Sequence, residues 1–270
     1  MKKLVYSVYA VVCYFIFFAA FLYLIGFVEN ANNFSGAALF GRLFPKTLDG
    51  GTANLSIFPS ILTDIFLIAL FGLQHSVMAR PEFKKKWVRF VPRPIERSTY
   101  VLCASLILVI LYSAWQPVNV AVWDLSRSVT GNIFFCISFA GWGMLLISTF
   151  LINHFDLFGL RQVYLFTRNR EFRHVTFKTP FFYRVVRHPL YLSFLIAFWF
   201  TPVMTFGHLV FSAGMSTYIL IGIHHEEKDL ERFYGEPYRQ YRLEVPKIIP
   251  FVKTGKRKLL EGSILKSVKR

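Results

Sequence analysis

Residues 189–225 read PLYLSFLIAFWFTPVMTFGHLVFSAGMSTYILIGIHH, which is 37 consecutive positions without Asp, Glu, Lys or Arg. As one helix this stretch would be about 56 Å long, nearly twice the ~30 Å hydrocarbon core of a bilayer. Thr201, Pro202 and Gly207 lie near its middle, where proline and glycine favour a break. The stretch therefore predicts a membrane hairpin whose first leg is short, tilted or only partly inserted.

Four further stretches, 4–28, 50–79, 98–123 and 128–155, are long and apolar enough to cross a membrane. The first is longer than the apolar region of a signal peptide, which predicts an uncleaved helix. The whole chain is 54% hydrophobic and 17% charged, against about 25% charged in soluble domains. We expect an all-α integral membrane protein with about six membrane segments, including the C-terminal helical hairpin and a cytosolic helical segment after it.

The basic residues predict the orientation of these segments. Of the 31 Lys and Arg, 28 fall on one side of a six-segment topology, and only Arg42, Lys46 and Arg127 fall on the other. The positive-inside rule then places both termini and the long loops in the cytosol, in a bacterial inner membrane. A net charge of +16 would alone suggest nucleic acid, but topology and headgroup attraction explain it. We therefore expect a lipid bilayer as partner, and no nucleic acid; the oligomeric state stays open.

One membrane domain over residues 1–270 is expected, in three parts. Residues 1–155 form a four-span scaffold, and residues 156–250 form a catalytic half with a cytosolic loop, the hairpin 189–225 and a C-terminal helix 224–250. Residues 251–270 form a basic tail. The second half is richer in His, Tyr, Glu and Arg, so chemistry is expected there. Cys13, Cys103 and Cys136 have no paired spacing, which indicates neither a disulfide framework nor a structural zinc site.

Two polar segments flank the hairpin. Before it, RHPLY places Arg187 and His188 ahead of a proline suited to the first turn of a helix, where free amides can hold a carboxylate or phosphate. The alternative is that Arg187 snorkels to headgroups and His188 caps the helix. After the hairpin, Glu226 and Glu227 stand where the last span leaves the bilayer, either partnered at a site or simply solvated.

An aromatic stripe follows these glutamates. Leu230, Tyr234, Tyr238, Tyr241 and Val245 recur at helical spacing, which predicts a helix packed against the membrane domain. His224 and His225 are adjacent and point in different directions on a helix, so they match no familiar metal-ligand spacing.

Histidines and an aspartate of the first half are also candidates. Asp64 and His75 are about three helical turns apart, so they share one helix face that we expect to look inward. Asp64 is a functional candidate because ionisable groups inside spans are costly, although a structural hydrogen bond explains it as well. His154 marks the cytosolic end of the fourth span, where a cap or loop anchor is the alternative role.

The two flanking segments together resemble the signature of membrane methyltransferases related to isoprenylcysteine carboxyl methyltransferase. The matching residues are Arg187, His188, Pro189, Tyr191, Glu226, Glu227, Leu230, Gly235, Tyr238, Tyr241, Val245, Pro246 and Pro250. Ser193 and Tyr234 are mild departures, where the family often has glycine and phenylalanine. Four further stretches resemble the methanethiol S-methyltransferases of the NnrU-like branch: GLQHSVMARPEFK from Gly72, ERSTYVL from Glu96, NHFDLFGLRQVY from Asn153 and FWFTPVMTFGHLVFS from Phe198.

This resemblance implies methyl transfer from S-adenosylmethionine to methanethiol, which gives dimethyl sulfide and S-adenosylhomocysteine, with no metal. By resemblance the cofactor pocket comprises Arg187, His188, Tyr191, Glu226, Glu227, Tyr238 and Tyr241. Arg187 is the candidate for the methionyl carboxylate, and a glutamate for the ammonium or ribose. Because the thiolate is the nucleophile, a base or an electropositive site is needed. His188, His154 and His75 are the catalytic candidates, and residue type does not choose among them.

Four alternatives stay open. The same scaffold could methylate another acceptor, such as a prenylated cysteine carboxylate, a phospholipid amine or a longer thiol. Sterol reductases share an RHP-type element, but they are longer and lack the paired glutamates. A non-catalytic NnrU-like protein would bind haem and no S-adenosylmethionine. A transporter would need a polar path, for which Asp64 alone is thin support.

Overall fold

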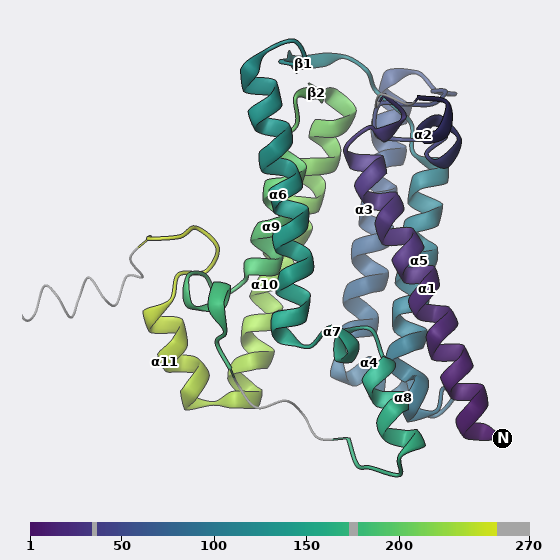
Figure 1. The fold of residues 1–270 in the computed structure, drawn as a ribbon, viewed down its shortest axis with the longest axis vertical. Helices are drawn as coiled ribbons and strands as arrows, with labels where there is room; N and C mark the ends of the chain where they lie inside the picture. The colour runs from purple at the N-terminus through teal and green to yellow at the C-terminus, as the bar shows by residue number, and fades with distance from the viewer. Residues whose placement is uncertain (34–36, 173–177, 253–270) are drawn as a thin grey trace, which may run out of the picture.

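Long apolar helices dominate the computed structural model, which describes residues 1–33, 37–172 and 178–252. Within this part of the chain five helices are long and apolar enough to cross a membrane. They are α1 (Lys2–Val28), α3 (Ile57–Ala79), α5 (Arg93–Ala114), α6 (Val129–Ile152) and α10 (Phe206–Tyr234), and they run side by side (Figure 1). The predicted class, an all-α multi-pass membrane protein, is confirmed.

Short elements close the two ends of this bundle. At one end lie η1 (Ala31–Asn33), α2 (Ala37–Leu43), β1 (Ala121–Asp124) and β2 (Val203–Thr205); at the other lie the N-terminus, α4 (Pro81–Trp87), α7 (His154–Leu157) and α8 (Leu160–Thr167) (Figure 1). The remaining elements are η2 (Phe181–Arg184), α9 (Pro189–Trp199) and α11 (Glu236–Glu244). Of the predicted basic tail, only Phe251 and Val252 fall within the described residues.

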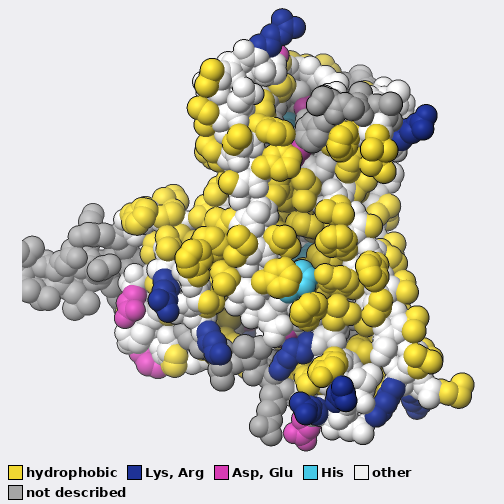
Figure 2. Space-filling view, viewed as in Figure 1, with side chains coloured by type: hydrophobic (Ala, Val, Ile, Leu, Met, Phe, Trp, Pro, Cys, Tyr) yellow, Lys and Arg dark blue, Asp and Glu magenta, His cyan; other side chains and the backbone are white. Residues whose placement is uncertain are grey.

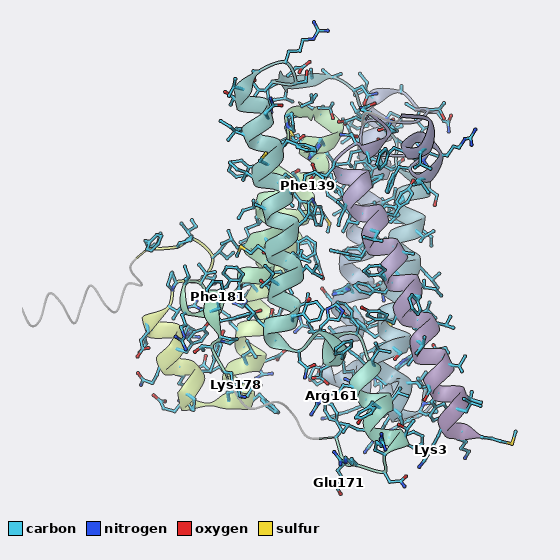
Figure 3. The ribbon with its side chains drawn as sticks, in the orientation of Figure 1. Lys3, Phe139, Arg161, Glu171, Lys178 and Phe181 are labelled. Atoms are coloured by element: carbon cyan, nitrogen blue, oxygen red, sulfur yellow. The ribbon has the colours of Figure 1, made fainter. Side chains whose placement is uncertain are left out.

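The surface has the pattern of a membrane protein. Hydrophobic side chains cover the middle of the visible face, while Lys and Arg gather toward the end that carries α4 and α8 (Figure 2). Lys3, Arg161 and Glu171 lie at this end, and Phe139 on α6 points outward at mid-height (Figure 3). The charge asymmetry on which the orientation was predicted is therefore present in three dimensions.

The helices pack in two groups. In one group α5 packs between α1 and α3; in the other α6 packs on α9, and α10 touches both α9 and α3. Rings fill the junction: Phe27 of α1 and Phe211 of α10 meet Trp115 edge to face, with centroids 5.9 and 5.7 Å apart. Asp64 is fully buried and accepts the backbone N–H of Gln116 at 2.8 Å, which holds the loop after α5 against α3.

The predicted hairpin breaks where expected. α9 ends at Trp199 and α10 begins at Phe206, with extended backbone between them. The last carbonyls of a helix have no hydrogen-bond donor within the helix, and the hydrocarbon of a membrane contains no donor for them. Side chains supply the donors: His208 and Ser212 lie 3.0 and 2.8 Å from the carbonyl oxygen of Phe198. At 11 residues, α9 is about 16 Å long, so the short first leg is confirmed.

Two of the predicted boundaries were wrong. The third span ends at Ala114 and not at Trp123, because residues 121–124 form β1, which pairs antiparallel with β2 across the top of the hairpin. The separate helix over 224–250 was also wrong. Residues up to Tyr234 continue α10, and α11 begins after Gly235, whose φ of +64° turns the chain as glycine allows.

Candidate active site

The RHP segment is held by backbone pairing with the segment after α11. Pro189 is the first residue of α9 and leaves the preceding residues outside the helix. The amide of Arg187 donates to the carbonyl of Pro246 at 2.9 Å, and that of His188 donates to Lys247 at 3.2 Å. Residues about 60 positions apart in the sequence thus form one unit at the start of α9.

Arg187 locks this unit with its side chain. Its Nε and Nη2 lie 2.8 and 2.7 Å from Oε1 of Glu227, and its Nη1 donates to the carbonyls of Arg242 (2.7 Å) and Val245 (2.9 Å). The residue is 8% exposed. Most of the N–H groups of this guanidinium therefore hydrogen-bond to residues of α10 and of the end of α11.

Glu227 is equally engaged. Besides Arg187, its Oε1 lies 3.2 Å from Nε2 of His188, and its Oε2 lies 3.5 Å from Nζ of Lys247. Buried carboxylates need such partners, since an unpaired charge is costly in a low dielectric. We call Arg187, Glu227 and Lys247 the ionic brace. The geometry favours a positioning role for Arg187 and Glu227 over the direct ligand contacts that the resemblance implied.

Glu226 differs from its neighbour. Its Oε2 is shielded from solvent and has no hydrogen-bond partner among the described residues. Nδ1 of His188 lies 4.0 Å from this oxygen, and the Glu226 side chain as a whole is 41% exposed. The Tyr191 hydroxyl pairs with the Glu226 side chain. The His188 and Tyr191 rings are 5.7 Å apart. A carboxylate oxygen held in this way beside aromatic rings is suited to a cationic or hydroxyl-bearing ligand.

The aromatic stripe is made by two helices. Tyr238, Tyr241 and Val245 of α11 are buried, and Leu230 and Tyr234 of α10 pack on them across the turn. The Tyr241 hydroxyl donates to the carbonyl of Tyr183 at 2.6 Å. Burial, with Glu227 nearby, raises the pKa of the Tyr238 hydroxyl, so this group stays protonated at neutral pH. The stripe therefore seats α11 against the ionic brace.

The three candidate histidines lie in different places. His188 is in the site, 4% exposed. His154 is remote from the brace: its Nε2 and Nδ1 pair with the hydroxyls of Tyr14 (2.8 Å) and Thr149 (2.9 Å), and burial lowers its pKa. This geometry supports the anchoring alternative for His154. His75 lies on α3, facing α10, and its contacts are described below.

Two residues that the motifs did not include share a face of α10 with Glu226. Tyr218 and Gly222 precede it by eight and four positions, which places all three along one side of the helix. A Cβ added to Gly222 would meet no heavy atom within 4 Å, so the surface of α10 is open at this half-buried position. The spacing Tyr-xxx-Gly-xxx-Glu was visible in the sequence, but nothing there showed which face the site would use.

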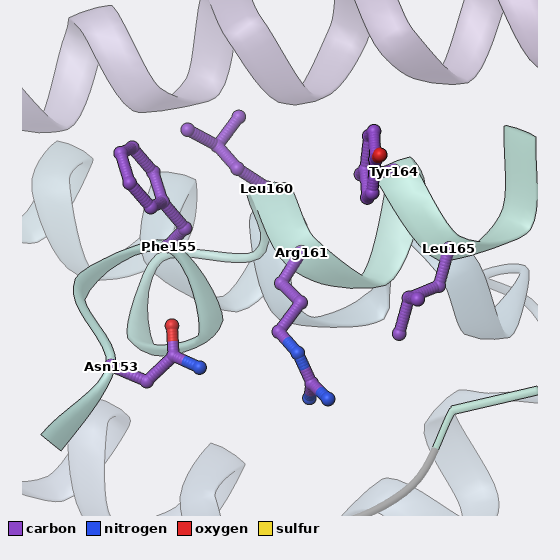
Figure 4. A pocket seen from close by; sticks show the side chains of 6 residues that line it. All are labelled: Asn153, Phe155, Leu160, Arg161, Tyr164 and Leu165. Atoms are coloured by element: carbon purple, nitrogen blue, oxygen red, sulfur yellow. The ribbon is translucent and has the colours of Figure 1, made fainter. Parts of the chain in front are cut away.

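A separate hollow of about 430 Å³ lies beside α7 and α8 (Figure 4). It is lined by Asn153, Phe155, Leu160, Arg161, Tyr164 and Leu165. Arg161 ion-pairs with Asp156 at 3.2 Å. None of these residues belongs to the RHP segment or the ionic brace, so the hollow is not part of the site.

Metal ligands do not cluster in the described ranges: no group of three or more His, Cys, Asp or Glu could hold an ion there. The ring centroids of the adjacent His224 and His225 are 5.5 Å apart.

Comparisons with known proteins identify the family. A methanethiol S-methyltransferase of Crocosphaera subtropica is 46% identical over 244 residues, 90% of this chain and 91% of the relative. One from Mycobacterium tuberculosis is 42% identical over 251 residues, 93% and 98% of the two chains. Nurim of Xenopus laevis is 28% identical over 209 residues, 74% and 72%. No family model and no solved structure matches. The two methyltransferases match 90% and 93% of this chain at more than 40% identity, so the chain belongs to the methanethiol S-methyltransferase family.

Proposed function

We propose that this protein transfers a methyl group from S-adenosylmethionine to methanethiol, giving dimethyl sulfide and S-adenosylhomocysteine. The observation that carries the donor site is the solvent-shielded Oε2 of Glu226, beside the Tyr191 hydroxyl and on the same face of α10 as the open position at Gly222. Methanethiol as the acceptor rests on the names of the relatives.

The donor site fits the chemistry of S-adenosylmethionine. Glu226 would accept hydrogen bonds from the ammonium or a ribose hydroxyl of the donor, which is the strong, charge-assisted kind. The Tyr191 and Tyr218 rings would face the sulfonium, an attraction of about 0.5–2 kcal/mol. His188 and Tyr238 complete the lining. Arg187 and Glu227 act through the ionic brace, by holding α9, α10 and α11 in register.

The position of the site suits the reaction. Glu227 lies 21 residues into α10, about 31 Å from its first residue at 1.5 Å per residue and so about one hydrocarbon thickness away. The site is thus at the membrane boundary nearest α4 and α8. A thiolate and a sulfonium neutralise each other as the methyl group moves, so a poorly hydrated site favours the charge-dispersed transition state. Alignment of sulfur, methyl and sulfonium supplies the proximity contribution.

The membrane placement is part of the proposal. Both termini and the basic end of the bundle lie in the cytosol of a bacterial inner membrane, following the distribution of Lys and Arg. The donor then enters from the cytosol, where S-adenosylmethionine is made. Fusing a periplasm-active phosphatase to either terminus should give no activity, and a fusion in the loop that holds Arg127 should be active.

The test of function is headspace gas chromatography of cells that express the chain and receive methanethiol, beside an empty-vector control. We expect dimethyl sulfide above the control. The purified protein should bind S-adenosylmethionine by calorimetry. If the protein binds S-adenosylmethionine but produces no dimethyl sulfide, methanethiol is not the acceptor, and the protein is a methyltransferase for another acceptor. If the purified protein contains haem and does not bind S-adenosylmethionine, the proposed methyltransferase function is wrong.

A further inference from the structure

His75 sits in a cage of aromatic rings between three helices. Phe71 of α3, Tyr100 of α5 and Tyr218 of α10 surround its imidazole, with centroid distances of 5.4, 5.0 and 6.3 Å. Its Nδ1 is shielded from solvent and has no hydrogen-bond partner within the described ranges. Buried polar atoms are rarely left without a partner, and an imidazole nitrogen can accept a proton. This nitrogen is therefore available to a ligand inside the cage.

The cage is small. A Cβ added to Gly72 would lie 2.9 Å from Cδ2 of Tyr218, so the tyrosine ring rests directly on the backbone of α3. The Tyr218 hydroxyl pairs with the Ser76 side chain, which fixes the ring in this position. Rings pack on His75 from three sides, so only a small group could reach its Nδ1.

The cage also carries a positive charge at its rim. The guanidinium of Arg97 lies 4.9 Å above the Tyr100 ring, and its Nε donates to the carbonyl of Leu157 at 2.8 Å. It is close enough to act electrostatically on His75. A fixed cation stabilises a thiolate over a thiol. The same cation opposes a proton on the His75 imidazole, so the cage holds a weak proton acceptor in a field that favours sulfur anions.

α10 connects the cage to the donor site. Tyr218 closes the cage, Gly222 one turn later borders open space, and Glu226 one turn further belongs to the donor site. The Tyr191 hydroxyl is in electrostatic range of Tyr218, Tyr100 and Glu226, so it stands between the two sites. A small acceptor in the cage would face a methyl group held at Gly222.

We propose that His75 is the catalytic base and that its cage binds the short-chain thiol, an inference that rests on the proposed function. The S–H proton of methanethiol passes to Nδ1 of His75, and the thiolate sulfur forms a bond to the methyl carbon. The bond from that carbon to the sulfonium sulfur breaks, and its electron pair stays on the sulfur of S-adenosylhomocysteine. His75 then gives its proton to water.

The experiment compares two acceptors in His75→Gln. Methaneselenol matches methanethiol in shape, but a selenol is already ionised at neutral pH and needs no base. We expect kcat/KM for methanethiol to fall about 100-fold or more, the usual contribution of a general base. For methaneselenol it should fall less than 10-fold, and the affinity for S-adenosylmethionine should not change. Leu73→Ala, on the exposed face of the same helix, is the matched control and should keep wild-type values.

Each outcome is decisive. Equal losses for the two acceptors with intact donor binding would assign His75 a structural role, and wild-type turnover would remove it from the site. If His75→Gln does not fold, His75→Asn is measured instead, together with the pH profile of the wild type. A base at His75 requires a low-pH fall in kcat/KM with the thiol that is absent with the selenol. If the wild type methylates neither acceptor, the proposed function fails, and the role of His75, which rests on it, fails with it.

Discussion

Replacing Arg187 with Lys tests whether the ionic brace holds the site together. Lysine offers three donors from one point, and it cannot reproduce the fork of arginine. One contact with Glu227 can survive, but the carbonyls of Arg242 and Val245, now 2.7 and 2.9 Å from Nη1, lose their donor. Hydrogen bonds to charged groups contribute about 1.5–3 kcal/mol each. The docking of α11 should therefore weaken by about 3–6 kcal/mol.

The effect should be local. α11 has nine residues, and an isolated helix of this length is unstable in water, so undocking exposes its amides. At about 1.4 kcal/mol per tenfold, the equilibrium shifts at least 100-fold toward the open form. Donor affinity falls with the fraction of docked molecules.

The measurement is hydrogen exchange with mass spectrometry in nanodiscs, read on peptides that cover residues 236–245. Exchange there should accelerate about 100-fold or more, while peptides of α1, α3 and α5 stay unchanged. Arg184→Lys is the matched control, because this nearby arginine is exposed and makes one bond, to the carbonyl of Thr179. If the exchange rate of α11 in Arg187→Lys stays within tenfold of the wild-type rate, the ionic brace does not hold α11 in place.

Three further changes test other parts of the structure. Glu226→Gln should weaken S-adenosylmethionine binding about 10- to 100-fold by calorimetry, since it removes a charge-assisted contact; the exposed Glu236→Gln should not, and equal effects would deny Glu226 its role. Gly222→Leu should fill the open space and abolish donor binding in a folded protein, so normal affinity would place the donor elsewhere. His208→Phe should cost about 1 kcal/mol because Ser212 still donates to Phe198. Adding Ser212→Ala should then lower the unfolding temperature by more than the two single changes combined. If the two effects simply add, the Phe198 carbonyl does not require a hydrogen bond from His208 or Ser212.

Much of the fold could be predicted because hydrocarbon imposes a simple rule on composition. Long stretches without charge became the spans, and Pro202 and Gly207 marked the turn of the hairpin. The β1–β2 ribbon could not be predicted, since residues 121–123 are apolar like the helix before them and β1 pairs with residues about 80 positions away. The continuation of α10 to Tyr234 was missed because the aromatic spacing runs unbroken across Gly235.

The sequence predicted which polar segments lie together better than it predicted their contacts. RHPLY and the paired glutamates do meet, but sequence alone cannot say which glutamate is neutralised. Glu227 and not Glu226 takes Arg187, because a rotation of about 100° per residue separates their directions on α10. His75 looked equivalent to His154 in the sequence. Only the packing of three helices distinguishes a nitrogen without a partner from one held by Tyr14 and Thr149.

The extended break between α9 and α10 also constrains how the chain is built. With 11 residues, α9 is too short to enter the bilayer as an independent helix. Near the end of α9, Ser138 of α6 donates to the carbonyl of Ala197 at 2.9 Å, and in the break itself Nε1 of Trp123 in β1 donates to the carbonyl of Thr201 at 3.1 Å. Both donors are synthesised before α9 leaves the ribosome. The hairpin must therefore insert as a pair against a completed α6, and catalytic competence is the last property that the growing chain acquires.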